Sequence, residues 1–324
     1  KQDPYGVLTS GIEHINLGKA DWTDEEVDAL VKPGTQWDPT KYLNIWVVKF
    51  SVNLLGYAQF PSNSNLMGLD GYDGDAYTEG IVINYDAMGT NAQNDGSFEL
   101  DPRFNKGRTA THETGHFLGL RHIWGDKGSR EDEVIDCTAS DFCSDTPQAG
   151  WENYDCDIVD SCPLVEGNDM IENYMDYTND ACMNTFTAGQ RTRMVAVMTN
   201  SPRRKELASS TVTSPGFVRT LDGALKNILI SNSVCNSSFT PSINIENKGT
   251  NTIQTATITY RIDNANPKTF IWNGNLAQNA TELISIPEIV SSSGTHLFTA
   301  EITTLNNATD LNSLNDILMI FLWK

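Results

Sequence analysis

The stretch HETGHFLGLRH, residues 112 to 122, constrains this chain most, because it holds three of the chain's five histidines. His112 and His116 are four residues apart, so on a helix they project from one face and reach one metal ion at about 2.0 to 2.1 Å. Gly119 lets the chain leave the helix and turn back, so that His122 supplies a third nitrogen. Three protein ligands leave the fourth position of a tetrahedral zinc ion open for water, which is typical of a catalytic site.

Glu113 stands beside the first of these histidines. A zinc ion lowers the pKa of water at its open position to about 7, and Glu113 is placed to take that proton and pass it to a leaving amine. Core histidines would match the spacing H-E-x-x-H-x-x-G-x-x-H only by rare chance, on the order of 10⁻⁵ for this composition. A structural zinc site would have no use for Glu113. We therefore predict a catalytic zinc site with Glu113 as the general base.

The composition excludes two classes of partner. A formal net charge of −20 argues against binding to a phosphate backbone, which needs a clustered basic surface. No run in the sequence approaches the roughly 18 to 20 apolar residues of a membrane helix. We expect a soluble protein with no nucleic-acid partner and no membrane span.

The first part of the chain mixes predicted helices and strands. Thr23 and Glu26 form a capping pattern at the start of a predicted helix over 21–31. A second predicted helix carries the histidines and ends near Gly119, and a third, capped by Thr187, covers 186–200. Apolar runs predict strands at 44–50, 54–60 and 80–88. Periodicity is absent from 121 to 185, an acidic, cysteine-containing loop that needs disulfides or bound cations to hold it.

The rest of the chain has a different pattern. Polar, proline-containing sequence precedes short alternating segments such as SINIE, TATITYRI and HLFTAEI, which turn sequences separate at intervals of roughly ten residues. This spacing is typical of a β-sandwich. We predict an α+β catalytic domain over 1–205, a linker over 206–222 and an all-β, immunoglobulin-like sandwich over 223–324.

Six cysteines indicate an oxidising compartment. Five of them fall between residues 137 and 182, while Cys235 stands alone. Five is an odd number, so at least one of that group is free or pairs outside it. A zinc cluster of thiolates is disfavoured, because no C-x2-C pair is present.

The histidine motif resembles that of the metzincin metalloproteases, in which a methionine turn follows downstream. The segment ENYMDYTNDACM, residues 172–183, supplies Met175 for such a turn. The segments HETGHFLGLRHIWG and ENYMDY are similar to the corresponding motifs of the pappalysin family of secreted enzymes. SDTP at 144–147 and the spaced cysteines add to this likeness. The likeness implies a metzincin catalytic domain with a mixed twisted sheet, an active-site helix and a Met-turn, and it does not extend to the C-terminal domain.

The resemblance also implies roles for individual residues. Tyr177, two residues after the methionine, would donate a hydrogen bond to the oxyanion of the tetrahedral intermediate. Asp180 would pair with the basic residue of a substrate cut before arginine or lysine. The strand within 80–88 would be the edge strand that pairs with an extended peptide substrate.

Disulfides and calcium follow from the same resemblance. The family disulfides match Cys137 with Cys162 and Cys156 with Cys182, and whether Cys143 and Cys235 pair is left open. A family calcium loop matches residues 140–147, and calcium takes six to eight hard oxygen ligands. The oxygens available there come from Asp141, Ser144, Asp145 and Thr146, together with the carbonyl of Ser140.

We therefore predict a secreted zinc endopeptidase that acts on protein and peptide substrates. The resemblance also implies an inhibitory pro-segment whose cysteine occupies the zinc, and none is present in this sequence, so we expect the active form. The alternative is an adhesion protein in which the sandwich binds a surface and the metal domain is accessory. Glu113 separates the two hypotheses, because a binding protein has no use for that carboxylate.

Overall fold

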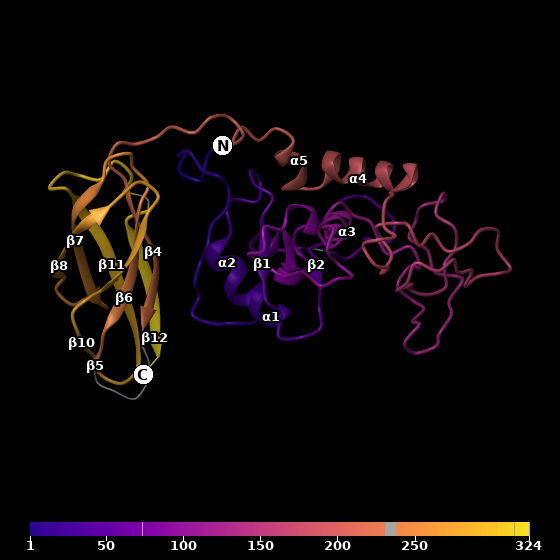
Figure 1. Cartoon of the computed structure of the whole chain (residues 1–324), viewed down its shortest axis with the longest axis horizontal. Coiled ribbons are helices and arrows are strands. Elements are labelled where there is room, and N and C mark those ends of the chain that lie inside the picture. The colour runs from indigo at the N-terminus through magenta and orange to yellow at the C-terminus, as the bar shows by residue number, and fades with distance from the viewer. Residues whose placement is uncertain (73, 231–237, 314, 324) are drawn as a thin grey trace. The chain divides into compact units, whose positions relative to one another are not determined.

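The computed structural model describes residues 1–72, 74–230, 238–313 and 315–323, which form two compact units. One, the 20–211 unit, comprises Ala20–Thr211; the other, the C-terminal unit, joins Lys1–Lys19 to Val212–Lys324 (Figure 1). The sequence predicts a catalytic domain from residue 1, whereas residues 1–19 belong with the C-terminal strands. They do so because Val7 forms a parallel bridge with Phe217.

The first helical segment of the 20–211 unit begins where the sequence predicts. It comprises α1 (Asp24–Glu26), a π-helical turn η1 (Val27–Val31) and α2 (Lys32–Thr35). The predicted capping box is present, because Thr23 N donates to Glu26 Oε2 at 3.0 Å and Glu26 N donates to Thr23 Oγ1 at 3.2 Å.

A three-stranded sheet supports the histidine helix. Its order is β1 (Ile45–Val48), β3 (Ile81–Asn84), β2 (Gly56–Ala58), with β3 parallel to β1 and antiparallel to β2. The expectation that residues 80–88 include an edge strand is wrong, because β3 is the central strand. Its unbroken apolar run is buried on both faces, as in a central strand, and β2 forms an edge instead.

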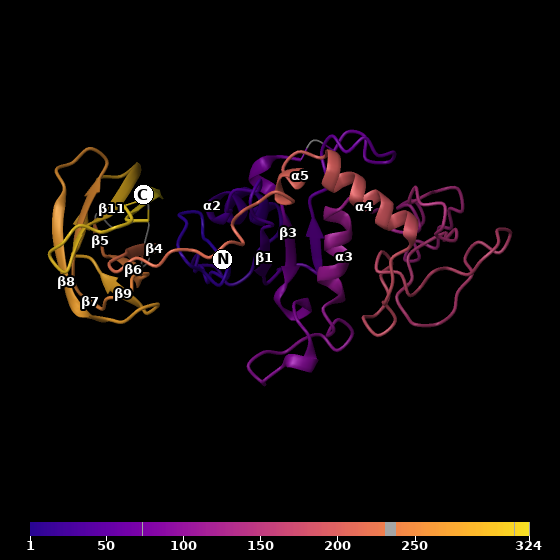
Figure 2. The same cartoon turned by 90° about the horizontal axis from the view of Figure 1, so that it is seen from above.

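Three further helices complete this unit. They are α3 (Arg108–Phe117), α4 (Ala188–Asn200) and α5 (Arg204–Leu207), and 3₁₀ turns lie at η2 (Ala76–Thr78), η3 (Tyr85–Ala87) and η4 (Asn91–Gln93). Helix α3 packs on β2 and β3 (Figure 2). Among the described residues, no helix has both the length and the apolar character needed to cross a membrane.

The long loop predicted after the histidine helix is present. Residues 118–187, all of them described, contain isolated bridges but no helix or longer strand. The loop packs on a small core of Leu120, Ile123, Trp124, Ala149 and Met175. The helix that follows, α4, starts with a capping box between Thr187 and Gln190, as the sequence predicts.

The C-terminal unit is all-β in its described residues. Its strands are β4 (Gly223–Ile230), β5 (Ser238–Phe239), β6 (Pro241–Asn247), β7 (Ile253–Ile262), β8 (Lys268–Leu276), β9 (Thr281–Ser285), β10 (Ile289–Val290), β11 (Thr295–Leu305) and β12 (Ile317–Trp323). One sheet has the order β12-β11-β7-β8, a second has the order β4-β6-β9, and β10 pairs with β5.

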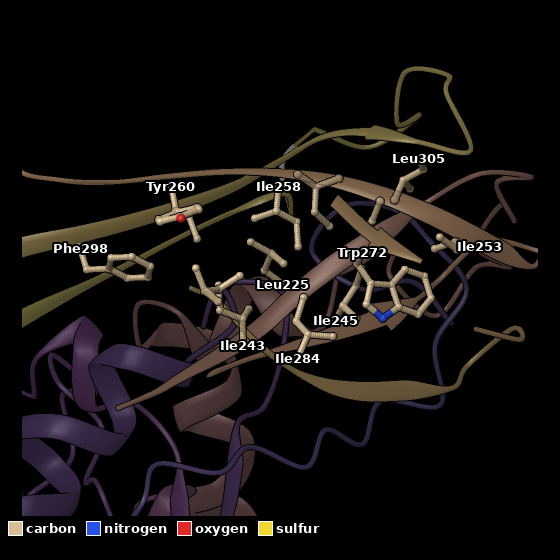
Figure 3. Close-up of a cluster of buried hydrophobic side chains, with 14 of the residues drawn as sticks. Leu225, Ile243, Ile245, Ile253, Ile258, Tyr260, Trp272, Ile284, Phe298 and Leu305 are labelled. Carbon is tan, nitrogen blue, oxygen red and sulfur yellow. The ribbon is translucent and has the colours of Figure 1, made fainter. Parts of the chain in front are cut away.

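One hydrophobic core joins the two larger sheets of this unit. It takes Ile243 and Ile245 from β6 and Ile258 and Tyr260 from β7, with Phe298 from β11 (Figure 3). The side chains of β6 alternate between buried and half-buried positions, which is the period-two pattern of a strand with one face in the core.

Candidate active site

Helix α3 and the turn after it bring the three histidines together. His112 and His116 lie on its buried face, one turn apart. The helix ends at Phe117, and Gly119 has φ of +85°, a left-handed conformation in which a side chain would also meet Val197. The chain then turns back, as predicted, and places His122 beside the other two.

The three Nε2 atoms converge on one point. They lie 3.0 Å apart between His112 and His116, 2.9 Å between His116 and His122, and 3.2 Å between His112 and His122. Nitrogens about 2.0 to 2.1 Å from a tetrahedral zinc ion lie roughly 3.3 Å from one another. Among the described residues, this is the one group of three or more His, Cys, Asp or Glu side chains whose ligand atoms all lie within 4.8 Å. The site therefore fits a zinc ion.

The opposite ring nitrogens fix the tautomers. His112 Nδ1 lies 2.7 Å from the carbonyl oxygen of Tyr174, and His116 Nδ1 lies 2.8 Å from that of Leu120. His122 Nδ1 contacts the Asp126 carboxylate. Because each acceptor requires a proton on Nδ1, each Nε2 keeps a free lone pair for a metal. Three lone pairs pointing at one another need a cation between them.

Burial keeps the imidazoles neutral, which is the form that binds metal. It lowers the pKa of His112 to about 3, and the neighbouring His116 adds to the effect. Burial and then His122 lower the pKa of His116 to about 3 as well. For His122, burial lowers the pKa although Asp126 opposes it.

Glu113 projects from α3 toward strand β2. Burial raises its pKa to about 8, and its Oε2 has no hydrogen-bond partner among the described residues. Gly56 on β2 provides the space, because a Cβ there would lie 3.0 Å from Glu113 Oε1 and 2.8 Å from the carbonyl oxygen of Val82. A cation held by the histidines would lower this pKa, and the ionised carboxylate, with one oxygen free of donors, then has the chemistry of a general base.

Met175 lies beneath the histidine helix. It is fully buried, and a Cβ on Gly115 would lie 2.3 Å from its sulfur, so the glycine within the motif makes room for the methionine. Its carbonyl oxygen accepts from Ile123 N at 3.2 Å, and its own N donates to Asn173 Oδ1 at 2.9 Å. Met175 therefore lies where a Met-turn would place it, below the histidine helix.

Tyr177 lies at the rim of the site. Its ring centroid is 4.7 Å from that of His122 and 5.7 Å from that of His112, and the residue is 40% exposed. Burial of the phenol and the nearby Glu113 carboxylate raise its pKa, so it carries a proton to donate. The Trp124 ring stacks on His122 with centroids 4.3 Å apart, and it also lies 4.8 Å from the Tyr177 ring.

Asp180, which the resemblance assigns to substrate binding, also binds the protein's own backbone. Its Oδ2 accepts from Lys106 N at 2.7 Å and from Arg108 N at 3.2 Å, so it caps the N-terminus of α3, where Gly107 offers no side chain. Burial raises the pKa of Asp180, and its Oδ1 has no partner among the described residues.

The predicted calcium loop has its oxygens engaged in local hydrogen bonds. Asp141 is buried and accepts from Cys143 N and from Thr146 Oγ1, both at 2.9 Å. Asp145 accepts from Thr187 Oγ1 at 2.8 Å and from Gly189 N at 2.7 Å, and so caps α4. Ser144 is exposed.

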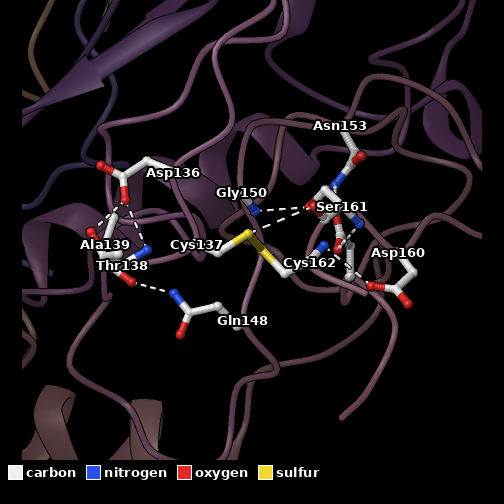
Figure 4. The surroundings of a disulfide bond; sticks show 11 residues. Asp136, Cys137, Thr138, Ala139, Gln148, Gly150, Asn153, Asp160, Ser161 and Cys162 are labelled. Atoms are coloured by element: carbon white, nitrogen blue, oxygen red, sulfur yellow. Dashed lines mark hydrogen bonds between the residues drawn. A yellow bond between two sulfur atoms is a disulfide. The ribbon is translucent and has the colours of Figure 1, made fainter. Parts of the chain in front are cut away.

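Two disulfides close the long loop, and they are the two that the resemblance implies. Cys137 is bonded to Cys162, and Cys156 is bonded to Cys182. Around the first bridge, Ser161 Oγ accepts from Gly150 N at 2.8 Å (Figure 4). Cys143 is a buried free thiol, and Cys235 lies outside the described residues.

A comparison with known proteins shows to which family this chain belongs. Residues 25–199 match the model of the peptidase family M43, described as pregnancy-associated plasma protein-A. The chain belongs to this family. The predicted likeness to the pappalysins is therefore confirmed.

Proteins of similar sequence support the assignment. The chain is 34% identical over 193 residues to an extracellular metalloprotease of Arthroderma otae, covering 59% of this chain and 63% of the relative. It is 35% identical over 177 residues to one of Colletotrichum graminicola, covering 54% of this chain and 56% of that one. The matched segments therefore span less than two thirds of each relative's length.

Solved structures of the family share the fold. Mature mirolysin of Tannerella forsythia, in complex with a cleaved peptide, is 38% identical with a TM-score of 0.53, covering 64% of this chain and 72% of that one. A promirolysin mutant is 35% identical with a TM-score of 0.54, covering 67% and 66%. The 20–211 unit thus has a mirolysin-like metzincin fold.

The sequence did not single out Asp126, which holds the third histidine of this M43 site. Its other oxygen accepts from Arg121 Nη2 at 2.9 Å, and its φ of +65° turns the carboxylate back toward His122. Burial raises its pKa, but the hydrogen bonds from His122 and Arg121 prevail and lower it to about 2. An aspartate four residues after a ligand was a signal available in the sequence.

Proposed function

We propose that the chain is a secreted, zinc-dependent endopeptidase in which Glu113 is the general base. The observation that carries the proposal is the buried Glu113 carboxylate without a donor, beside three histidine lone pairs that converge. A zinc ion held by these histidines would supply a Lewis acid for the scissile carbonyl and an acidified water.

The chain's own groups then perform the proton transfers. Glu113 takes a proton from the attacking water and delivers it to the leaving amine, which makes the amine a better leaving group. Tyr177 donates its phenolic proton in a hydrogen bond to the oxygen on which negative charge develops. Trp124 stacks on His122, and Asp126 holds its Nδ1, so that this ring stays aimed at the metal.

Strand β2 is the proposed binding edge for an extended peptide. It lies at the edge of the sheet next to α3, and Gly56 brings its backbone against Glu113. A peptide that adds to this edge would carry its backbone past the general base. The edge strand proposed from sequence, within 80–88, is central and does not take this role.

Cleavage before arginine or lysine is proposed to depend on Asp180. Its Oδ1 is buried without a donor, while Oδ2 caps α3. An Asp180→Asn variant keeps an oxygen for the cap but loses the charge, so we expect a weaker preference for a basic residue after the cut. Digestion of a peptide library with product identification by mass spectrometry would show an unchanged preference if the pairing does not exist.

We propose that the loop at 140–147 binds a calcium ion. Asp141 and Asp145 lie in the loop with Thr146 and Ser144, and a bound ion would replace some of their present hydrogen bonds. We expect calcium removal at constant zinc to speed autolysis within the loop. Unchanged autolysis and unchanged thermal stability would argue against this ion.

Secretion and latency are supported by the relatives. Several are named extracellular metalloproteases, and a promirolysin is among the similar structures. We propose that this chain is likewise exported and that an inhibitory segment is removed to activate it. We also propose that the C-terminal unit is an immunoglobulin-like sandwich. The adhesion hypothesis gains no specific observation, because Glu113 and its surroundings are intact.

The decisive variant is Glu113→Gln, which keeps the shape of the side chain. We expect casein hydrolysis to fall about 10²- to 10⁴-fold, the usual contribution of a general base. Zinc content should stay at that of the parent. Glu99→Gln, an exposed carboxylate of the same unit, is the matched control and should retain full activity. Undiminished hydrolysis by Glu113→Gln with its zinc retained would overturn the proposed role.

A further inference from the structure

A second group of oxygen atoms lies in the C-terminal unit, remote in sequence from the histidine motif. Asp310 and Asp316 come from the loop between β11 and β12, and Asp222 directly precedes β4. Their exposed fractions are 7%, 4% and 0%. Aspartates are rarely buried unless they are paired. Among the described residues, the basic side chain paired with this group is Arg219, whose Nη1 lies 3.5 Å from Asp222 Oδ2.

Two of these carboxylates are in contact with each other. Asp316 lies within hydrogen-bonding reach of Asp310, and burial followed by the charge of Asp310 raises the pKa of Asp316 to about 8. The oxygens of Asp310 already accept from Gly223 N and from Asn312 N, each at 2.7 Å. Asp316 Oδ1 has no donor among the described residues. Two acceptor oxygens in contact need a proton or a cation between them.

Two asparagine side chains add further oxygens without donors. Asn315 Nδ2 donates to Asp222 Oδ1 at 2.9 Å, and Asn312 Nδ2 lies 3.4 Å from Asp222 Oδ2. Because both amide nitrogens face Asp222, both amide oxygens are turned away from it, and neither has a donor among the described residues. Asn312 is only 3% exposed, so its oxygen is shielded from bulk solvent.

We propose that this group binds one calcium ion, with Asp310, Asp316 and the amide oxygens of Asn312 and Asn315 as ligands. Carboxylate and amide oxygens are the hard ligands that calcium takes, six to eight of them with carbonyls and waters, at about 2.3 to 2.6 Å. The three carboxylates do not all lie within 4.8 Å of one another. We assign Asp222 the role of orienting the amides, because its oxygens face the amide nitrogens of Asn312 and Asn315.

The charges of the group agree with a divalent ion. Three carboxylates and one guanidinium sum to −2, which one Ca²⁺ neutralises. Mg²⁺ suits the site less, because it demands octahedral geometry and keeps several of its waters. The ion would fix the loop between β11 and β12 to the start of β4, independently of the proposed peptidase activity.

Calorimetric titration of the full chain with CaCl₂ tests the site. All proteins in the test carry Glu113→Gln, which prevents self-digestion, and are first freed of calcium. We expect the additional Asp316→Asn substitution to remove one equivalent of bound calcium or to weaken it at least tenfold. Glu301→Gln removes an exposed charge near the group and is the control, which should bind as the parent does. Sites elsewhere contribute equally to all three proteins.

A second measurement covers the case in which Asp316→Asn does not fold. The unfolding temperature of the C-terminal unit in the parent should rise with CaCl₂ and not with an equal concentration of MgCl₂, and Asp310→Asn should abolish the rise. Equal calcium stoichiometry together with equal affinity in Asp316→Asn and its parent would overturn the proposal. So would an unfolding temperature that does not respond to calcium, because a shared proton then joins Asp310 and Asp316.

Discussion

Among the described residues of the C-terminal unit, a single cluster of seventeen buried residues spans both larger sheets, whereas those of the 20–211 unit form three separate clusters of four or five. The 20–211 unit instead holds its long loop with two disulfides and with polar contacts. One unit is therefore stabilised mainly by continuous apolar burial, and the other by links between segments that have little regular structure. A loop held by such links can fold around a metal site, whereas the backbone of a packed sheet is already engaged in hydrogen bonds between strands.

Buried polar side chains hold the turn of the 20–211 unit that carries the third histidine. Arg204 is fully buried, pairs with Glu79 Oε1 at 2.7 Å and reaches the carbonyl oxygen of Phe117 at the end of α3. Arg193 reaches the carbonyl oxygen of Gly119 at 3.2 Å. These arginines come from α5 and α4 and hold the turn that leads to His122. The position of the third histidine thus depends on these hydrogen bonds as well as on the apolar packing of Leu120, Ile123 and Trp124.

The largest expected effect is on the core of the C-terminal unit. Phe298 is fully buried, with its ring centroid 6.3 Å from that of Phe239 and 6.4 Å from that of Tyr260. Phe298→Ala should therefore lower the free energy of unfolding of this unit by about 3 to 5 kcal/mol. Scanning calorimetry of the full chain measures the loss. Cleavage of a short peptide should be unchanged, and a parallel loss of this activity would contradict the division of roles.

The next effect concerns the disulfide between Cys137 and Cys162, which are 25 residues apart. Replacing both by serine frees a loop whose closure is worth about 3.5 kcal/mol in the chain-entropy description. We expect the free energy of unfolding of the 20–211 unit to fall by that amount. The free energy of unfolding of the C-terminal unit should not change. Cys143→Ala removes a thiol but no covalent link and should have a much smaller effect.

A smaller effect is expected at the metal. Asp126→Asn weakens the acceptor for His122 Nδ1 and removes the charge that Arg121 also binds, so zinc should bind about 10- to 100-fold more weakly. Competition with a chromophoric chelator measures this affinity without reference to activity. Asp101→Asn, which breaks the ion pair with Arg103, is the control and should leave zinc affinity unaltered.

The smallest effect is at the start of α4. Thr187 Oγ1 accepts from Gln190 N and donates to Asp145, so Thr187→Ala should cost the 20–211 unit about 1 kcal/mol of unfolding free energy. Urea denaturation measures the change. Thr192→Ala, on an exposed position of the same helix, should be nearly neutral, and an equal loss in both variants would show that the cap contributes nothing.

The sequence predicted those features of the site that a few neighbouring residues determine by themselves. The four-residue spacing of His112 and His116, the left-handed turn at Gly119 and the capping pairs of Thr23 and Thr187 all depend on local backbone geometry. The two disulfides could be named from the family resemblance, although nothing in their spacing fixes the pairing.

The remaining features depend on tertiary contacts that spacing does not encode. The carbonyl oxygens of Tyr174 and Leu120, which orient two histidines, carry no signal in residue type. The edge role of the strand within 80–88 came from the family resemblance and was wrong, because the unbroken apolar run at residues 81–83 belongs to a strand that is paired on both sides. Asp180 caps α3 from more than seventy residues away, which local patterns do not reveal.

X-ray absorption at the zinc edge, combined with metal analysis of the full chain, tests the central claim most directly. We predict one zinc ion per chain, with three imidazole nitrogens at about 2.0 to 2.1 Å and one exchangeable oxygen from solvent. A coordination shell completed by a fourth protein side chain, or a protein that takes up no zinc, would contradict the account.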